Sequence, residues 1–254
     1  LDLAEKHGLN VLRSVVVNTG EVPENLDYPV ITKDINPNAG GWKSDVFVCH
    51  DENELKEAYS KISSPVILLQ EYVEKKTEFA FEGCSVNQGQ SSLLAIKSTY
   101  QYVIPAYYSP FMKCESLHDE KMKAALENML AEIGFEGIFE IEFLVDQNDV
   151  AYFLEINFRN ATWSYAATAA GMPLPYIWVK GMLEGKISSD AYKEVPGGFT
   201  AMVEPIDYEK RLELDISTPG EWLADFKKAN CTYYYNENDL EPFYEMVKNW
   251  EKLG

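Results

Sequence analysis

Two apolar strand sequences joined by a turn fill residues 137–160, GIFEIEFLVDQNDVAYFLEINFRN, and constrain the fold more than any other segment. The central residues 146–149, Asp-Gln-Asn-Asp, are turn formers, so the segment predicts a β-hairpin. Side chains alternate across a strand, which sends Glu140 and Glu142 to the face opposite their apolar neighbours. The chain is therefore expected to contain an antiparallel sheet with one packed face and one acidic face.

The pairing register of the two strands decides which charged side chains lie opposite each other. If the two valines next to the turn pair, Glu140 lies opposite Glu155 and Glu142 lies opposite Phe153. Asn157 follows on the same side of the strand as Glu155. We expect three carboxylates and one amide on a single surface, where like charges opposite each other destabilise a sheet by up to roughly 1 kcal/mol a pair.

Two interpretations of this acidic surface are open. It is either the solvated face of an ordinary hairpin or the site of a divalent cation that offsets the repulsion. Mg²⁺ prefers oxygen ligands and keeps waters and substrate phosphates in its shell, so carboxylates and an amide suit it better than zinc. Arg159, two residues beyond Asn157, favours the cation site because positive charge beside clustered carboxylates suits phosphate transfer. A plain ion pair with a glutamate is the alternative for Arg159.

Two lysines flank a glycine-containing loop early in the chain. Lys33 ends the apolar sequence YPVITK, and Lys43 follows Gly40 and Gly41 in the loop NAGGWKS. Small residues let backbone N–H groups approach phosphate oxygens, and both ammonium groups could neutralise phosphate charge. A flexible Gly-Gly turn with a solvated Lys43 is the alternative.

A third segment carries groups that suit a nucleoside. The strand sequence that begins at Val66 ends in Gln-Glu-Tyr-Val, residues 70–73, and Glu78 follows seven residues after Glu71. A strand end can offer backbone groups to a purine edge, and a carboxylate can hold ribose hydroxyls. Taken alone, the segment is more typical of an ordinary strand end.

Other patterns predict helices and strands around these segments. Apolar residues spaced three and four apart behind Asp119 predict a helix that Gly134 ends. Asp51, with a glutamate three residues later, predicts a capping box at the start of another helix. Residues 100–104 have the pattern of a strand. The uncharged run over residues 160–179 predicts two helices around a Gly-Met-Pro break rather than a membrane span.

The order of these segments resembles the ATP-grasp superfamily over roughly residues 1–185. The resemblance is strongest at LEINFRN, which is similar to the family's metal-binding Glu-x-Asn-x-Arg motif, with Glu142 thirteen residues before Glu155. Phe158 stands where the family commonly has proline. The stretch that follows, TWSYAATAAGMPLPYIW, resembles the carbamoyl-phosphate-synthase-like amino acid ligases, including D-aspartate ligases.

The resemblance implies an α+β fold in which two lobes with mostly antiparallel sheets enclose a nucleotide. It implies ATP with Mg²⁺, or alternatively Mn²⁺, and a carboxylate activated as an acyl phosphate from which an amine displaces phosphate. The positions that match the family's functional residues are, for the phosphates, Lys33 and Lys43; for the adenine, Glu71 and Val73; for the ribose, Glu78; for the metal, Glu142, Glu155 and Asn157; and for catalysis, Arg159 and Lys43.

The same resemblance predicts how the chain is divided. We expect a small lobe over residues 1–70, a large lobe with the metal-binding hairpin over residues 71–189, and a C-terminal extension over residues 190–254. The family usually carries an α/β domain before these lobes, and this sequence begins where the first linking helix should end. A truncated ligase without that domain is therefore expected.

Composition limits the partners and the compartment. The chain has 22 basic and 41 acidic side chains, a formal charge of −19, which repels nucleic acid and anionic membranes. Its four cysteines form no CxxC pair, so reduced thiols and a cytoplasmic location are expected. The predicted partners are small-molecule carboxylate and amine substrates, with a homodimer left open.

Two rival functions stay open from the sequence. One is a nucleotide-binding regulatory module that has lost catalysis, and retention of the metal and arginine positions argues against it. The other is an acidic binding domain without nucleotide, in which the hairpin carboxylates are solvated.

Overall fold

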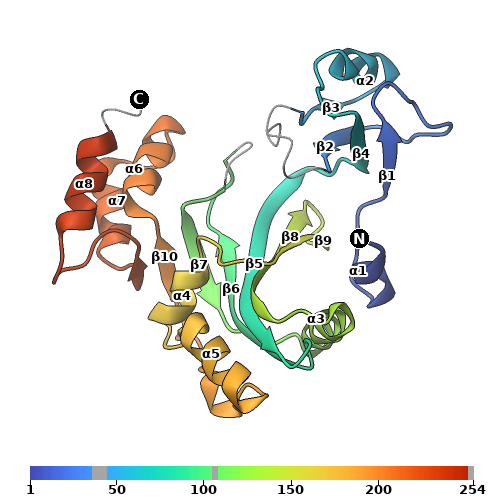
Figure 1. The fold of residues 1–254 in the computed structure, drawn as a ribbon. Coiled ribbons are helices and arrows are strands. Elements are labelled where there is room, and N and C mark those ends of the chain that lie inside the picture. Colours follow the sequence, from blue (N-terminus) through green and yellow to red (C-terminus); the bar gives the residue numbers. More distant parts are fainter. Residues whose placement is uncertain (36–44, 105–107, 251–254) are drawn as a thin grey trace.

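Two sheets with helices packed on their faces make up the molecule (Figure 1). The computed structural model describes residues 1–35, 45–104 and 108–250. Most neighbouring strands are antiparallel, and helices cover the sheets rather than alternate with strands. The fold is therefore α+β, as the sequence predicts.

The smaller sheet has four strands in the order β1–β4–β2–β3. Its strands are β1 (Ser14–Asn18), β2 (Val30–Asp34), β3 (Val48–Cys49) and β4 (Val66–Glu71). Helix α2 (Glu52–Tyr59) packs on this sheet through Leu55, which is fully buried. Asp51 caps α2 as predicted, since its carboxylate accepts two backbone N–H groups of the first turn. Glu54 bonds the N–H of His50 rather than that of Asp51, so the second half of the capping box is displaced by one residue.

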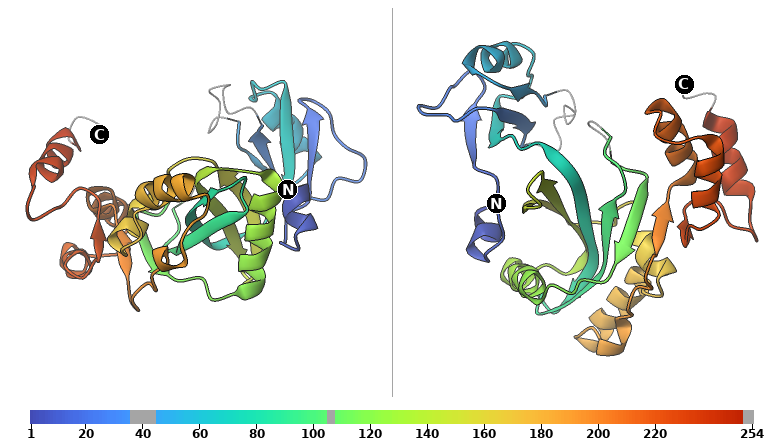
Figure 2. Two further views of the ribbon diagram at one scale, coloured as in Figure 1. Left: turned by 60° about the horizontal axis from the view of Figure 1, so that its bottom comes forward. Right: turned by 180° about the vertical axis from the view of Figure 1, so that it is seen from behind.

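The larger sheet has seven strands in the order β11–β10–β7–β6–β5–β8–β9. Its strands are β5 (Lys75–Val86), β6 (Ser91–Tyr100), β7 (Phe111–Glu115), β8 (Gly137–Asp146), β9 (Ala151–Asn157), β10 (Thr200–Met202) and β11 (Cys231–Thr232). Strand β5 lies between β6 and β8 and runs up to the small sheet, since β4 ends only four residues before β5 begins (Figures 1 and 2).

Helices bury the two faces of the large sheet in different cores. On one face, α1 (Asp2–Lys6) and α3 (Glu120–Ile133) cover the rings of Phe79 and Phe143, which stack at 4.9 Å between centroids. Asp119 caps α3, and Gly134 ends it at φ 69°, as predicted. On the other face lie α4 (Ser164–Ala169) and α5 (Leu174–Glu184), the two helices expected around the Gly-Met-Pro break. No helix of the described residues is long and apolar enough to span a membrane.

The strand expected over residues 100–104 is wrong. Strand β6 itself runs through Tyr100, whose backbone lies opposite Met112 of β7. The chain leaves the sheet after this pair and returns at Phe111, so residues 101–104 connect β6 to β7 instead of forming a strand of their own.

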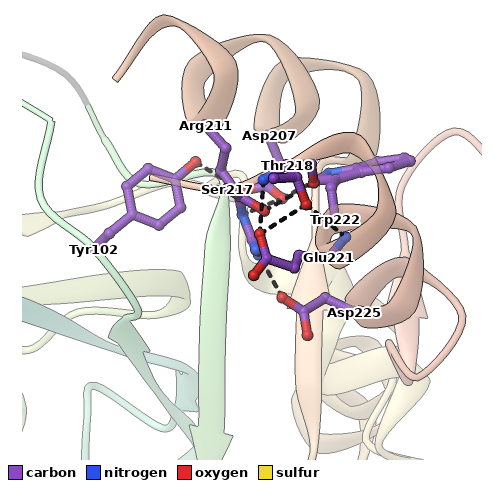
Figure 3. Close-up of polar contacts among 8 residues, drawn as sticks. All are labelled: Tyr102, Asp207, Arg211, Ser217, Thr218, Glu221, Trp222 and Asp225. Carbon is purple, nitrogen blue, oxygen red and sulfur yellow. Dashed lines mark hydrogen bonds and ion pairs between the residues drawn. The ribbon is translucent and has the colours of Figure 1, made fainter. Parts of the chain in front are cut away.

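The C-terminal part adds the short helix η1 (Ser189–Ala191) and the helices α6 (Glu204–Glu213), α7 (Pro219–Phe226) and α8 (Glu241–Trp250). Figure 3 shows how α6 and α7 attach to the connection after β6. The buried carboxylate of Asp207 accepts from Tyr102 Oη at 2.7 Å and from Trp222 Nε1 at 2.9 Å. Arg211 lies 3.0 Å from Asp207 and 2.7 Å from Asp225, so it ties α6 to α7.

Candidate functional site

The predicted hairpin forms, and Asp146 builds its turn. Asp146 Oδ1 accepts from the backbone N–H groups of Asn148 at 2.9 Å and Val150 at 2.8 Å. These bonds lower the pKa of the Asp146 carboxyl, because they stabilise its charged form. Asp149 has φ 63°, the left-handed conformation that aspartate tolerates in turns.

The predicted register of the hairpin is wrong. Glu142 lies opposite Glu155, not Phe153, and Glu140 lies opposite Asn157, not Glu155. The turn is one residue longer than expected, and Leu154 is an extra residue in β9, a β-bulge that the partner strand does not match.

The bulge decides which face the functional residues occupy. Phe153 packs in the core beneath α3, so regular alternation would send Glu155 and Asn157 into that core as well. Because Leu154 interrupts the alternation, Glu155 and Asn157 turn to the acidic face beside Glu142. The expected cluster on one surface is therefore present, reached through a different register.

The amide of Asn157 joins the carboxylates of this cluster. Its Nδ2 donates to Glu140 at 3.1 Å, to Glu142 at 2.8 Å and to Glu155 at 3.2 Å. On the other side, its Oδ1 accepts from Arg159 Nη2 at 3.2 Å. Asn157 is thus hydrogen-bonded to the other four side chains of the cluster, Glu140, Glu142, Glu155 and Arg159.

Burial and mutual repulsion raise the pKa of the inner carboxyls. Burial, followed by the charges of Glu140 and Glu155, raises the pKa of Glu142 to about 8. Burial and the charge of Glu82 raise the pKa of Glu140 to about 7. Both shifts mean that negative charge on this face is costly without a cation nearby.

The side chains of this cluster fit a hard divalent cation only if water and phosphate oxygens complete its ligand shell. Within residues 1–35, 45–104 and 108–250, no three His, Cys, Asp or Glu side chains converge well enough to hold a metal by themselves. Glu142 and Glu155 supply two carboxylates, and a half-turn of the Asn157 amide would add its oxygen to them. A cation with few protein ligands completes its shell with water and phosphate, as Mg²⁺ and Mn²⁺ do.

Lys33 brings a positive charge to this face from the small sheet. Its Nζ donates to Gln70 Oε1 at 2.7 Å, so β2 and β4 hold it jointly. Burial lowers the pKa of Lys33, and the carboxylates of Glu155, Glu78 and Glu142 oppose that shift because they lie near it. Lys33 therefore lies near enough to Glu142 and Glu155, two of the predicted metal ligands, to interact with their charges. The small sheet, which carries Lys33 on β2, stands above β8 and β9 in the view of Figure 1.

The predicted ribose carboxylate lies beside them at the start of β5. Glu78 Oε1 accepts from Lys75 Nζ at 2.8 Å, and the Glu78 side chain is mostly buried. Tyr100 lies near the same carboxylate, and burial followed by the charges of Glu78 and Glu142 raises the pKa of the tyrosine. Lys75 and Tyr100 are members of this site that the sequence analysis missed.

The predicted adenine positions lie on the link between the sheets. Glu71 is the last residue of β4, its N–H donates to Arg13 O at 2.8 Å, and its carboxylate pairs with Arg13 Nε at 3.2 Å. Val73 lies half-buried in the three-residue link to β5. Lys43 and its loop lie outside the described residues.

Glu82 is the main functional candidate that the sequence analysis did not find. It is fully buried on β5, directly opposite Glu140, and burial raises its pKa to about 7. The one available signal was its spacing: Glu78 and Glu82 share a parity on β5, on the side of the acidic face.

Two hollows in the structure lie away from this face. One of about 250 Å³ lies beside α5, and one of about 410 Å³ lies between α4 and residues 230–242.

No family model matches the chain. A D-alanine–D-alanine ligase of Fusobacterium nucleatum is 29% identical over 150 residues, which cover 54% of this chain and 47% of that protein. The chain spans about half the length of the curated relative it matches.

Solved structures of other proteins superpose on most of this chain. The L-amino acid ligase of Bacillus licheniformis superposes with a TM-score of 0.59 at 19% identity, over 78% of this chain and 50% of that one. The N5-carboxyaminoimidazole synthetase of Staphylococcus aureus superposes with a TM-score of 0.63 at 18% identity, over 85% of this chain and 57% of that one, and it has also been solved with ADP. The chain therefore has the fold of the ATP-grasp superfamily.

Proposed function

We propose that this chain carries the nucleotide and metal site of an ATP-dependent carboxylate–amine ligase. A substrate carboxylate oxygen attacks the γ-phosphorus of ATP, the bond from that phosphorus to the bridging oxygen breaks, and ADP leaves. An amine then attacks the acyl carbon, loses a proton and displaces phosphate. The observation that carries the proposal is the meeting of Lys33 with the Glu142–Glu155–Asn157 cluster across two sheets.

Each residue has a distinct task in this proposal. Glu142, Glu155 and Asn157 would hold Mg²⁺ or Mn²⁺, which when bound neutralises phosphate charge. Lys33 faces the same phosphates from the small sheet. Arg159, held by Asn157, stabilises charge on the acyl phosphate and on the intermediate formed by the amine.

The remaining nucleotide contacts complete the site. We assign Glu71 and Val73 to the adenine and Glu78 to the ribose on the sequence resemblance. The position of Glu71 at the end of β4 and the effect of the Glu78 charge on Lys33 support this assignment. Lys43 keeps its assignment as a phosphate-binding and catalytic residue on the sequence resemblance alone. No covalent nucleophile is required, because positioning and electrostatic stabilisation suffice for phosphoryl transfer.

The substrates we propose are an amino acid or other small carboxylate and an amine of an amino acid or peptide. The names of the D-alanine–D-alanine ligase and the L-amino acid ligase support this class. A cytoplasmic location fits the four buried, unpaired cysteines. A homodimer stays open as the assembly.

The division into residues 1–70, 71–189 and 190–254 is part of the proposal. The four-stranded sheet supports the first part, and the hairpin with α4 and α5 supports the second. The third part contributes β10 and β11 to the large sheet, so it is attached to the large lobe rather than to the small one.

Calorimetric titration of ATP in millimolar Mg²⁺ tests the binding half of the proposal. Glu155→Gln should weaken Mg·ATP binding at least tenfold, whereas Glu184→Gln on the exposed side of α5 should leave it unchanged. Phosphate release over a panel of amino acids then tests turnover. Absence of ATP binding by the wild-type chain would refute the proposal, and binding without release by the full-length protein would reduce it to a regulatory module.

A further inference from the structure

Glu82 has an unsatisfied oxygen beside the candidate site. The side chain is 0% exposed, and its Oε2 accepts from Ser164 Oγ at 3.0 Å. Its Oε1 is buried and has no hydrogen-bond donor among the described residues. Buried polar atoms are nearly always bonded, so an exception next to functional carboxylates calls for a reason.

Two chains of contacts lead from Glu82 to the metal end of the site. Across the β5–β8 pairing, Glu82 lies opposite Glu140, which in turn accepts from the Asn157 amide. Through its other oxygen, Glu82 holds Ser164, and the Ser164 hydroxyl accepts from the backbone N–H of Ala161. The second chain fixes the segment that directly follows Arg159.

We infer that Glu82 is a positioning residue that fixes the Asn157 amide through Glu140 and the Arg159 segment through Ser164, so that the metal and phosphate groups stay aligned. The inference rests on the proposed function, because it assigns that end of the site to Mg²⁺ and phosphate. Glu82 itself touches neither group. Its role is to hold the residues that do.

The chemistry of the pair explains why a carboxyl occupies this position. A carboxyl at position 82 has one oxygen that accepts from Ser164 and a second oxygen on a side chain that lies opposite Glu140 across the strand pair. A glutamine at position 82 would keep the geometry, since its amide oxygen can accept from Ser164 while its NH₂ donates to Glu140. A leucine of similar size would remove both links.

The test separates the metal end of the site from the nucleoside end. ATP binding is measured by calorimetry in EDTA and again in millimolar Mg²⁺, and the ratio of the two dissociation constants gives the gain due to the metal. For Glu82→Leu we expect the EDTA value within twofold of wild type, because the adenine and ribose positions are untouched, and at least a tenfold loss of the gain due to Mg²⁺.

Three further variants make the result specific. Glu82→Gln should keep the gain within threefold of wild type, and Ser164→Ala should lose part of it. Ser85→Ala removes another buried hydroxyl of the same strand, bonded to Phe135 O at 2.7 Å, and should leave the gain unchanged. Melting temperatures are recorded for all four, so that a loss of fold is visible separately.

Each outcome has a distinct meaning. If Glu82→Leu folds and keeps the full gain, or if Glu82→Gln loses as much as Glu82→Leu, the positioning role is wrong while the proposed function stands. If the wild-type chain binds no ATP in either buffer, the proposed function is wrong and the inference falls with it.

Discussion

Glu142 and Glu155 lie directly opposite each other on β8 and β9, and the Asn157 amide donates to both, at 2.8 and 3.2 Å. Two like charges in this position repel, and the amide offsets part of this repulsion because it donates to both carboxylates. Asn157 thus offers two kinds of group to this cluster: its NH₂ donates to the carboxylates, and its Oδ1 is an oxygen of the kind that a divalent cation binds.

Asn157→Asp should therefore destabilise the chain in a way that Mg²⁺ reverses. The substitution replaces a donor to three carboxylates with a fourth negative charge, at a cost of about 2 kcal/mol in the free energy of unfolding. We expect a lower melting temperature in EDTA and a larger recovery with Mg²⁺ than wild type shows. Asn53→Asp in the exposed first turn of α2 adds the same charge and should show neither effect; equal behaviour of the two variants would contradict the role of Asn157.

Lys33→Met should weaken nucleotide binding and change the stability of the free chain little. The substitution removes the charge that we propose to face phosphate, and it also removes the cost of burying an ammonium group whose pKa burial lowers. We expect at least a tenfold rise in the dissociation constant for ATP, about 1.4 kcal/mol. Lys61→Met, which breaks an exposed pair with Glu57 in the same lobe, is the control; unchanged affinity in Lys33→Met would exclude a phosphate contact.

The pH dependence of stability should change in Glu82→Gln. Burial raises the pKa of Glu82 from 4.5 to about 7, so the folded chain holds this proton more tightly than the unfolded chain. The resulting stabilisation is complete below pH 4.5 and is lost as the pH rises through 7. Glutamine is neutral at every pH, so the variant should be more stable than wild type at pH 8.5, by on the order of 1 to 3 kcal/mol, and the advantage should disappear near pH 5.

Thermal unfolding in EDTA from pH 5 to 8.5 measures this difference. The charges of Glu142 and Arg159 act on Glu82, with Glu140 opposite it and the Tyr233 ring close by, and all of them are present in both proteins. Parallel curves for the two proteins would show that Glu82 does not retain its proton on folding.

The buried pair of Asp207 and Arg211 should show strong coupling. Asp207→Leu leaves the Arg211 guanidinium buried without its main partner, and Arg211→Leu does the converse, each at roughly 3 to 5 kcal/mol. The double variant should lose far less free energy of unfolding than the sum of the losses in the two single variants. Urea unfolding of all four proteins gives the coupling energy, and the exposed pair Lys56–Glu52 should give below about 0.5 kcal/mol. Additive single effects in the buried pair would contradict the network of Figure 3.

Local signals predicted the elements whose ends depend on neighbouring residues in the sequence. Asp119 and Gly134 bound α3 because a carboxylate cap and a left-handed glycine act within one turn of the helix. The turn at Asp146 likewise depends on its own side chain and on backbone groups two and four residues away. The sequence also showed the order of Lys33, Glu78 and the acidic hairpin along the chain, on which the resemblance to the superfamily depends.

Features that depend on distant partners were not predictable in this way. The bulge at Leu154 is invisible to an alternation rule, because both faces of β9 accept apolar residues. Glu82 reads like any strand glutamate until Ser164, 82 residues away, is placed against it. Asp207 and Arg211 have the spacing of an exposed helix pair, and only the packing of Trp222 and Tyr102 buries them.

The bulge at Leu154 lies between the hairpin turn and the residues of the site, and it changes the pairing register of β9 at that point. Residues between Asp146 and Phe153 are paired in one register, and residues from Glu155 onward are paired in another. A change in the length of the turn therefore has to be compensated between the turn and Leu154 if Glu155 and Asn157 are to keep their partners. Deletion of Leu154 alone would leave the turn intact but would exchange the two faces of the rest of β9. Glu155 and Asn157 would then point beneath α3, so this one residue decides on which face of the sheet the site forms.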